Sequence, residues 1–260
     1  MISVKNLRLL ISKSELDRLP EGKLLINTIN AFSYNNARKD PLFEEALMYG
    51  DVLIPDGVSI VRACHILNAK SKPWERIAGW DLFVYEMSRM NEPLESQKTV
   101  PYWKKVHPER TRPVVMFMGS SERVLGKIRE QAAKSYKNID VVTYSPPFRP
   151  QFTLTDNMNM CKAINDADPD LLWIGMTAPK QEKWAYSNWV RLNINCHCGT
   201  VGAVFDFFAG TLERAPLAWQ QAGYEWLYRL LKEPKRMWRR YIIGNTEFLY
   251  LMFREWSKFC

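Results

Sequence analysis

Residues 23–57 read KLLINTINAFSYNNARKDPLFEEALMYGDVLIPDG, and this stretch decides the fold. Leu24–Ile29 and Val52–Ile54 are short apolar runs that are typical of buried strands, and the residues between them suit a helix. Polar residues mark the end of each predicted strand: Thr28 and Asn30 at the first, and Asp56 at the second. In a parallel α/β sheet the carboxyl ends of the strands share one edge, and ligands bind outside that edge. The sequence therefore predicts a site there, with Asp56 as its first candidate.

Strands and helices continue to alternate along the chain. This alternation predicts right-handed βαβ units and a mostly parallel sheet. We expect a short strand and a polar lead-in helix within Ile2–Leu19, and an exposed excursion or flexible loop at Asn91–Arg112. The other elements that we expect are helices at Val58–Ala69, Gly79–Met90, Glu122–Tyr136 and Thr155–Ala167, and strands at Val114–Met118, Ile139–Tyr144, Leu171–Ile174 and near Leu192–Cys196.

The composition is that of a globular protein. The chain has 260 residues, of which 47% are apolar and 25% charged, so it fits one large domain or a domain with an appendage. Its net charge of +8 indicates an anionic partner, which composition alone leaves open among nucleic acid, phosphorylated metabolites and acidic lipid. Five scattered cysteines favour a reducing compartment. We expect neither a signal peptide nor a membrane-spanning segment, and therefore a cytosolic protein.

The character of the chain changes after Trp219. The run EWLYRLLKEPKRMWRRYI, residues 225–242, places apolar and aromatic residues against basic ones, and Pro234 divides it into two helical segments. A face of this kind suits an interfacial membrane helix, and it would also bind phosphates. The aromatic residues fall on the apolar face rather than among the arginines, which argues against nucleic acid. A solvated charged face is the plainer alternative.

Asp56 supports two interpretations. A partly desolvated carboxylate at a strand end can act as a general base on a hydroxyl group. An aspartate before Gly57 and Val58 also occupies a standard position for a helix N-cap, and the local sequence alone favours the cap. Thr28 and Asn30 are likewise common in turns and local hydrogen bonds. Their predicted convergence on one edge is what favours a site.

Other motifs give weaker signals. Cys196-His197-Cys198 lacks the spacing of a structural zinc site, so core packing is the better interpretation. Cys64-His65 has no acidic or hydroxyl neighbour in sequence and is a weak nucleophile pair. The chain contains no dinucleotide fingerprint and no Walker loop. Gly119-Ser120-Ser121 before a predicted helix would suit a phosphate only weakly.

Several long motifs occur together and in order: NTINAFSYNNARKDPLFEEALMYGDVLIPDGVSIV, ERIAG, GMTAPKQEKW, GAVFDFFAGTLERAP and EWLYRLLKEPKRMWRRY. With these motifs the chain, from about Lys23 to Tyr241, resembles the WecG/TagA/CpsF family of bacterial glycosyltransferases, glycosyltransferase family 26. Members transfer a sugar from a nucleotide-sugar to a polyprenyl-diphosphate-linked acceptor during assembly of surface polysaccharides. The residues at Ala31-Phe32-Ser33, Gly119-Ser120-Ser121 and 91–112 depart from the family pattern, which leaves the donor sugar open.

The resemblance implies roles for individual residues. The aspartate of the PDG motif, Asp56, would be the base, and the pocket threonine and the arginine of the ERIAG motif match Thr28 and Arg76. The glutamine of the PKQE motif, Gln181, would contact substrate, and Asn30 is expected to do so from its place at the strand end. The arginines that would hold the donor or lipid diphosphate match Arg229, Arg236 and Arg239. The family is described as inverting and metal-independent, so no metal or other cofactor is expected.

Together these points predict a Rossmann-like α/β core at residues 1–212 and a basic helical appendage at 213–260 that docks on the cytoplasmic face of the inner membrane. The expected donor is a UDP-linked hexose, N-acetylmannosamine or its uronic acid. The expected partners are a polyprenyl-diphosphate-linked acceptor and an anionic membrane surface, without nucleic acid, and a homo-oligomer is left open. The alternatives are a non-catalytic phosphate- or nucleic-acid-binding protein on the same fold, and a glycosyltransferase with a soluble acceptor.

Overall fold

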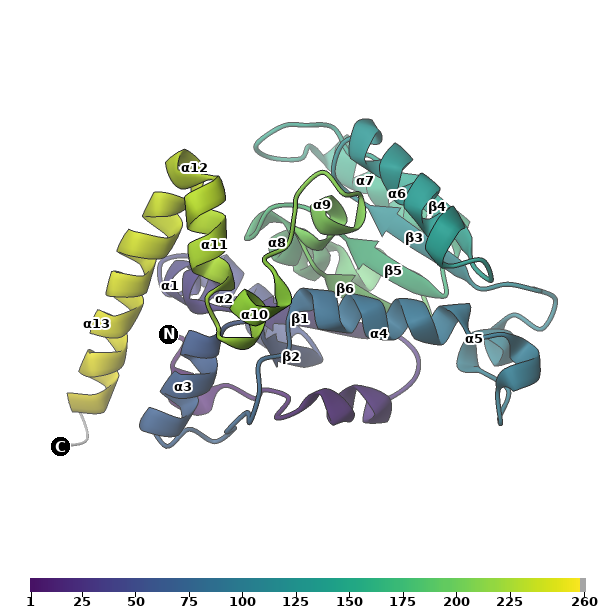
Figure 1. The fold of residues 1–260 in the computed structure, drawn as a ribbon. Helices are drawn as coiled ribbons and strands as arrows, with labels where there is room; N and C mark the ends of the chain where they lie inside the picture. The colour runs from purple at the N-terminus through teal and green to yellow at the C-terminus, as the bar shows by residue number, and fades with distance from the viewer. Residues whose placement is uncertain (258–260) are drawn as a thin grey trace.

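The computed structural model describes residues 1–257, which form a six-stranded parallel sheet between two layers of helices (Figure 1). Neighbouring strands pair in the order β2-β1-β6-β5-β3-β4, and every pair is parallel. The predicted Rossmann-like parallel sheet is therefore confirmed. The strands are β1 (Leu24–Ile29), β2 (Val52–Pro55), β3 (Val114–Met118), β4 (Asp140–Tyr144), β5 (Leu171–Ile174) and β6 (His197–Thr200).

Helices fill the connections between the strands and the segment after β6. The α-helices are α1 (Ala31–Ala37), α2 (Pro41–Tyr49), α3 (Val58–Ile66), α4 (Gly79–Asn91), α5 (Tyr102–Val106), α6 (Glu122–Ser135), α7 (Leu154–Ala167), α8 (Lys180–Asn188), α9 (Val204–Phe208), α10 (Leu217–Gln221), α11 (Glu225–Lys232), α12 (Pro234–Trp238) and α13 (Gly244–Ser257). Short 3₁₀ helices are η1 (Val4–Asn6), η2 (Lys13–Arg18), η3 (Leu94–Ser96) and η4 (Trp189–Arg191), and η5 (Arg239–Ile243) is a π-helical segment.

The core lies on both faces of the sheet because successive strand residues point to opposite sides. Leu24 and Ile26 of β1 pack with apolar residues of α4, α6 and α9. Leu25, between them, packs with residues of α7 and α8 on the other face. Ile29 and Leu53 belong to a third cluster, which α1, α2 and α3 cover together with α13. These faces are buried, so the edge formed by the strand ends is where the sheet can meet a ligand.

The last helix, α13, returns to the core. It runs beside α1 in Figure 1, where it is yellow. Phe248 and Met252 of α13 belong to the same apolar cluster as Tyr34 of α1, whose ring meets that of Phe248 edge to face at 5.6 Å. Glu255 accepts a hydrogen bond from the Ser3 hydroxyl at 2.8 Å. The predicted boundary at residue 212 thus separates two segments that share one apolar cluster.

Two local predictions are wrong. The first residues form η1 where a short strand was expected, because the buried Val4 and Leu7 are three residues apart and a 3₁₀ turn places such residues on one side; η2 lies where the lead-in helix was expected. The strand expected near Leu192–Cys196 begins only at His197. Before it, Asn193 N–H donates to the side chain of Asn165 at 2.8 Å, and of residues 192–196 only Cys196 O accepts a backbone bond from β1, from the Leu24 N–H at 3.3 Å.

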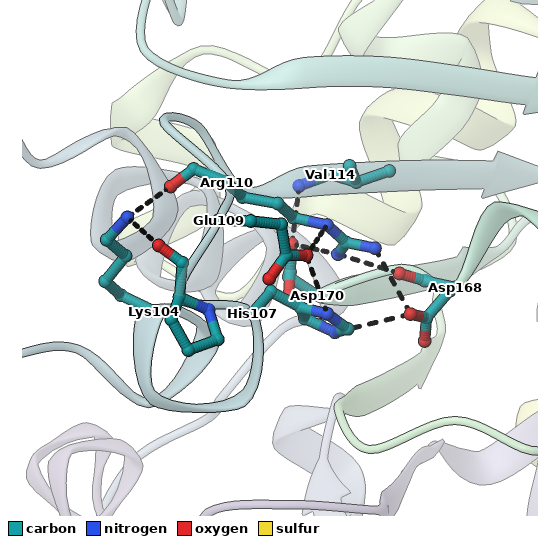
Figure 2. Close-up of polar contacts among 8 residues, drawn as sticks. Lys104, His107, Glu109, Arg110, Val114, Asp168 and Asp170 are labelled. Carbon is teal, nitrogen blue, oxygen red and sulfur yellow. Dashed lines mark hydrogen bonds and ion pairs between the residues drawn. The ribbon is translucent and has the colours of Figure 1, made fainter.

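The segment Asn91–Arg112 is mostly exposed, as predicted, but part of it is helical and packs against the core. It contains α5, and Trp103 of this helix is only 4% exposed. Figure 2 shows how its end is fixed: Arg110 donates to Asp170 at 2.9 Å and to Asp168 at 3.2 Å. These partners come from the loop just before β5, so the segment is tied to the amino-terminal edge of the sheet.

Candidate active site

A cleft of about 1260 Å³ runs along the carboxyl-terminal edge of the sheet. Residues at or just after the ends of all six strands line it, as expected for a ligand site in a parallel sheet. The structure therefore brings Thr28, Asn30 and Asp56 together in one cavity. The strand-end residues that line it are Thr28 and Asn30 (β1), Asp56 (β2), Ser120 (β3), Ser145 (β4), Met176 (β5) and Val201 (β6).

Asp56 is not a helix cap. Its backbone N–H donates to Ile29 at 2.9 Å and so continues the β1–β2 pairing, which moves the start of α3 one residue further on. Gly57 is the N-cap residue, and no side chain caps this helix. Burial raises the pKa of the Asp56 carboxyl to about 6, and the nearby Arg76 guanidinium opposes this rise. A carboxyl group in this state is suited to accept a proton near neutral pH.

The neighbours of Asp56 on β1 have different local roles. Thr28 is 9% exposed and lines the cleft. Asn30 also lines the cleft, but its Oδ1 accepts a hydrogen bond from the Ser33 N–H at 3.0 Å and so caps α1. Asn30 thus holds the start of α1 beside the cleft, while its predicted contact with substrate stays a prediction.

Arg76 reaches the cleft from the loop between α3 and α4, as the sequence predicted. Its Nη1 donates to Glu225 Oε2 of α11 at 2.9 Å. The other oxygen of Glu225 lies 3.5 Å from Arg214 Nε. One carboxylate from the appendage therefore lies between two guanidinium groups of the cleft, close to Asp56.

The basic residues of the appendage do not all face the cleft. Arg229 and Arg236 line it, and Arg236 also pairs with Glu233 at 2.8 Å. Arg239 is exposed, lies against the Trp238 ring at 5.4 Å, and is not a lining residue. Arg240 lines the cleft instead and lies 4.5 Å from the centre of the Phe32 ring. The π-helical segment η5 begins at Arg239, and such segments are frequent at functional sites.

Gln181 and Glu182 form a buried pair at the start of α8. Gln181 Oε1 accepts from the Met176 N–H at 3.1 Å, and its Nε2 donates to Glu182 Oε1 at 2.9 Å. The amide of Gln181 is thus used within the protein, and it fixes the turn between β5 and α8. Burial raises the pKa of Glu182, which is 1% exposed, to about 7, while the hydrogen bond from Gln181 opposes the rise.

Most of the buried polar side-chain atoms that lack a hydrogen-bond partner in residues 1–257 belong to residues of this cleft. Leaving such an atom unpaired costs about 1–3 kcal/mol, so native proteins keep few of them. Here they are mainly guanidinium nitrogens, which are donors for anionic oxygens. The atoms in the cleft are Glu182 Oε2, Arg214 Nε, Arg229 Nε and Nη2, and Arg240 Nε.

Aromatic rings hold two of these guanidinium groups in place. Arg214 lies 5.2 Å from the centre of the Trp80 ring and 5.9 Å from that of Phe207. Arg229 lies 5.6 Å from Phe207 on the same side of the cleft. Contacts of this kind leave the N–H groups at the edge of the guanidinium plane available. The cleft is therefore lined by oriented cations.

Cysteine and histidine side chains serve the core, as the sequence predicted. Cys196, His197 and Cys198 are at most 3% exposed, and His197 Nδ1 lies 2.7 Å from the buried Glu86. Burial raises the pKa of the Cys64 thiol to about 11, which disfavours a nucleophilic thiolate. In the described part of the chain, no group of three or more His, Cys, Asp or Glu side chains could hold a metal ion.

Sequence reasoning missed four residues of the cleft: Glu182, Arg214, Glu225 and Arg240. Glu182 and Arg214 lie inside the motifs PKQE and LERAP, so their motif neighbours were a usable signal. Glu225 and Arg240 also lie inside a quoted motif, EWLYRLLKEPKRMWRRY, but their contacts with Arg76 and Phe32 join segments more than a hundred residues apart in the chain. Only the folded arrangement identifies them.

An apolar stripe is exposed along α12, η5 and α13. Its members recur at helical spacing, and they include large aromatic residues. No helix within residues 1–257 combines the length and the apolar character needed to cross a bilayer. The exposed residues of this stripe are Trp238, Ile242, Leu249, Phe253 and Trp256.

Comparisons with known proteins identify the family of the chain. The model of the glycosyl transferase WecG/TagA/CpsF family matches residues 12–259. An N-acetylglucosaminyldiphosphoundecaprenol N-acetyl-beta-D-mannosaminyltransferase of Bacillus spizizenii is 27% identical over 232 residues, which cover 88% of this chain and 79% of that protein. A protein of the same name from Bacillus subtilis is 26% identical over 216 residues, covering 83% and 74% of the two chains. The chain is therefore a glycosyltransferase that belongs to the WecG/TagA/CpsF family.

Proposed function

We propose that the protein transfers N-acetylmannosamine, or a closely related hexose, from a UDP-linked donor to a sugar that is carried on a polyprenyl diphosphate. The names of the two Bacillus relatives support this choice of sugar and acceptor. The observation that carries the proposal is the position of Asp56: a carboxylate with a raised pKa lies in a cleft with unpaired guanidinium groups.

Asp56 is the general base in the proposed reaction. Its carboxylate takes the proton from the acceptor hydroxyl as that oxygen attacks the anomeric carbon of the donor sugar. The bond between the anomeric carbon and the diphosphate oxygen breaks at the same time, so the configuration inverts. A pKa of about 6 leaves most of the carboxylate ionised at pH 7 while keeping it a useful base.

The arginines of the cleft stabilise the leaving group. Departure of the nucleoside diphosphate concentrates negative charge on its oxygens, and fixed cations in a site of low polarity are the group that stabilises such charge. Arg229 and Arg240 have unpaired nitrogens for this purpose, and Arg214 lines the same cleft. The reaction proposed here uses these cations without a metal ion.

The apolar stripe on α12, η5 and α13 docks on the cytoplasmic face of the inner membrane. Trp238 and Trp256 suit the depth of lipid headgroups, and neighbouring basic residues such as Lys235 and Arg254 suit anionic lipid. A polyprenyl-linked acceptor lies in that membrane, so docking would bring its diphosphate to the cleft.

Replacement of Asp56 by Asn tests the proposal. We expect a loss of about 10²–10⁴-fold in kcat because the base is removed, with little change in the melting temperature. Release of nucleoside diphosphate from a panel of UDP- and GDP-sugars, with a polyprenyl-diphosphate-linked N-acetylglucosamine as acceptor, measures the effect. Asp166→Asn is the matched control, because Asp166 is exposed and pairs with Lys162 on α7. Near-normal activity of Asp56→Asn would contradict the assignment, and equal activity on a water-soluble glycoside would contradict the lipid acceptor.

A further inference from the structure

Glu225 is an unexpected residue in this cleft. It is the first residue of α11, in a segment whose other charged groups near the cleft are cations. Its side chain is 15% exposed and bridges Arg76, at 2.9 Å, and Arg214, at 3.5 Å. A carboxylate that pairs with two guanidinium groups in a cleft for anionic substrates calls for an explanation, because it reduces the positive charge available there.

The charges that face Asp56 come from four different elements. Arg76 comes from the loop between α3 and α4, Asp81 from α4, Glu225 from α11 and Arg240 from η5. Asp81 is already engaged, since it accepts from the Ala78 N–H at 2.8 Å and pairs with Lys13 at 3.3 Å. Glu225 is therefore the carboxylate that competes with Asp56 for Arg76.

The outcome of this competition decides whether Asp56 can work as a base. A carboxylate paired with an arginine typically has a pKa about 1–3 units below its usual value, and the pairing occupies its oxygens. Both effects weaken it as a proton acceptor. In the structure Arg76 bonds to Glu225, and no hydrogen bond joins it to Asp56 within the described residues. Burial raises the pKa of Asp56 to about 6, and the charge of Glu225 adds to this rise.

We propose that Glu225 is a positioning residue for Asp56: by holding Arg76 and Arg214, it keeps the carboxylate of Asp56 free for the acceptor hydroxyl. This inference rests on the proposed role of Asp56 as the base. It gives the appendage a second task. Besides cations for the leaving group, α11 supplies the anion that keeps the base active, so catalysis depends on the docked position of α11 in two separate ways.

Replacement of Glu225 by Gln tests the inference. Gln keeps the size and can accept one hydrogen bond from Arg76, but it lacks the charge, so Arg76 turns to Asp56. We expect the acid limb of the profile of kcat/KM against pH to move down by about one unit or more, and kcat on the plateau to fall several-fold. Glu213→Gln is the matched control, because Glu213 is an exposed glutamate of the same segment that pairs with Lys232. Its profile should match that of the wild type.

A double variant tests whether the effect passes through Arg76. In Arg76→Gln/Glu225→Gln the competing cation is absent, so the acid limb should return toward its wild-type position although the overall rate is low. Titration of ¹³C-labelled aspartate carboxyls by NMR gives the pKa of Asp56 directly and needs no activity. A lower pKa in Glu225→Gln supports the inference. If the pKa and the acid limb both stay at the wild-type position, Glu225 only tethers α11, and the inference is wrong.

The two proposals fail in different ways. If Asp56→Asn keeps near-normal activity, the proposed base is wrong, whatever Glu225→Gln does. If Asp56→Asn is inactive and Glu225→Gln raises KM for the donor without moving the acid limb, the base stands and only the positioning role is lost.

Discussion

The two edges of the sheet gather the same kinds of side chain and use them differently. At the amino-terminal edge, Arg110 bonds to Asp168 and Asp170, and Asp170 also accepts from the Val114 N–H at 2.8 Å (Figure 2). At the carboxyl-terminal edge, Arg229 and Arg240 keep unpaired nitrogens. Charged groups that are fully paired within the protein stabilise the fold, whereas charged groups that keep unpaired nitrogens in a cleft are available to a ligand. Pairing, rather than composition, distinguishes a structural cluster from a functional one.

The largest effect is expected at the amino-terminal edge, where the ion pairs should stabilise the fold. Arg110→Ala leaves Asp170, which is 7% exposed, without its cation. Removing one partner of a buried pair typically costs about 3–5 kcal/mol, so we expect a loss of this order in the free energy of unfolding. Denaturation by urea measures it. Arg112→Ala, in which an exposed arginine loses a 3.9 Å contact with Asp140, is the control. An unchanged stability would show that the cluster does not anchor residues 91–112.

The second test is at the cleft. Arg240→Ala should leave the free energy of unfolding nearly unchanged, because the guanidinium has an unpaired nitrogen in the ligand-free protein. Transition-state stabilisation should fall by about 2.7–4 kcal/mol, the typical effect of one oxyanion-binding donor. Comparison of kcat/KM for sugar transfer with the melting temperature separates the two effects. A large loss of stability with normal activity would reverse the roles of the two edges.

Glu182, at the carboxyl-terminal edge, should make the stability of the protein depend on pH. Its pKa in the folded protein, about 7, is above its ordinary value of 4.5, so folding favours the protonated form. Ionisation of Glu182 therefore lowers the free energy of unfolding. This destabilisation is absent below about pH 4.5, grows as the pH rises to about 7, and is constant above that. Glu182→Gln removes it. We expect the variant to match the wild type at pH 4.5 and to be up to about 3 kcal/mol more stable at pH 8. Equal stability at both pH values would contradict the burial of this charge.

The smallest effect is expected at Arg239, the neighbour of Arg240. The family resemblance assigns a diphosphate to Arg239, whereas the structure places it outside the cleft, against Trp238. Arg239→Ala should therefore change the activation free energy, obtained from kcat/KM, by less than about 0.5 kcal/mol, a small effect of the kind that is usual for an exposed side chain. If it loses more activity than Arg240→Ala, the resemblance is the better guide, and η5 must rearrange when substrate binds.

Local patterns predicted the sheet well because burial and periodicity are local signals. The strands Val114–Met118 and Leu171–Ile174 were predicted with their observed bounds, and Thr28 and Asp56 were placed at one edge. The carboxyl ends of parallel strands must meet, so strand assignments alone were sufficient for that part of the site.

The rest of the fold and of the site depended on contacts between distant segments. Arg110 fixes residues 91–112 through partners about 60 residues further along the chain, and no periodicity reports such a pair. The choice between Arg239 and Arg240 depends on how the helix turns at η5, which three or four residues of sequence do not reveal. Glu225 was missed because its contacts with Arg76 and Arg214 form only in the folded chain.

The return of α13 to the core changes how residues 213–243 can move. Their start is held near α9, where Thr211 and Leu212 bond to Asp206, and their end continues into α13, where Gly244 accepts from Asn35 at 2.7 Å. Residues 213–243 are thus held to the rest of the protein at both ends. Gly223, with its φ of +78°, and Pro234 lie between these two anchors. The arginines of residues 213–243 are consequently carried by a segment that is held at both ends, which favours the same geometry at every turnover.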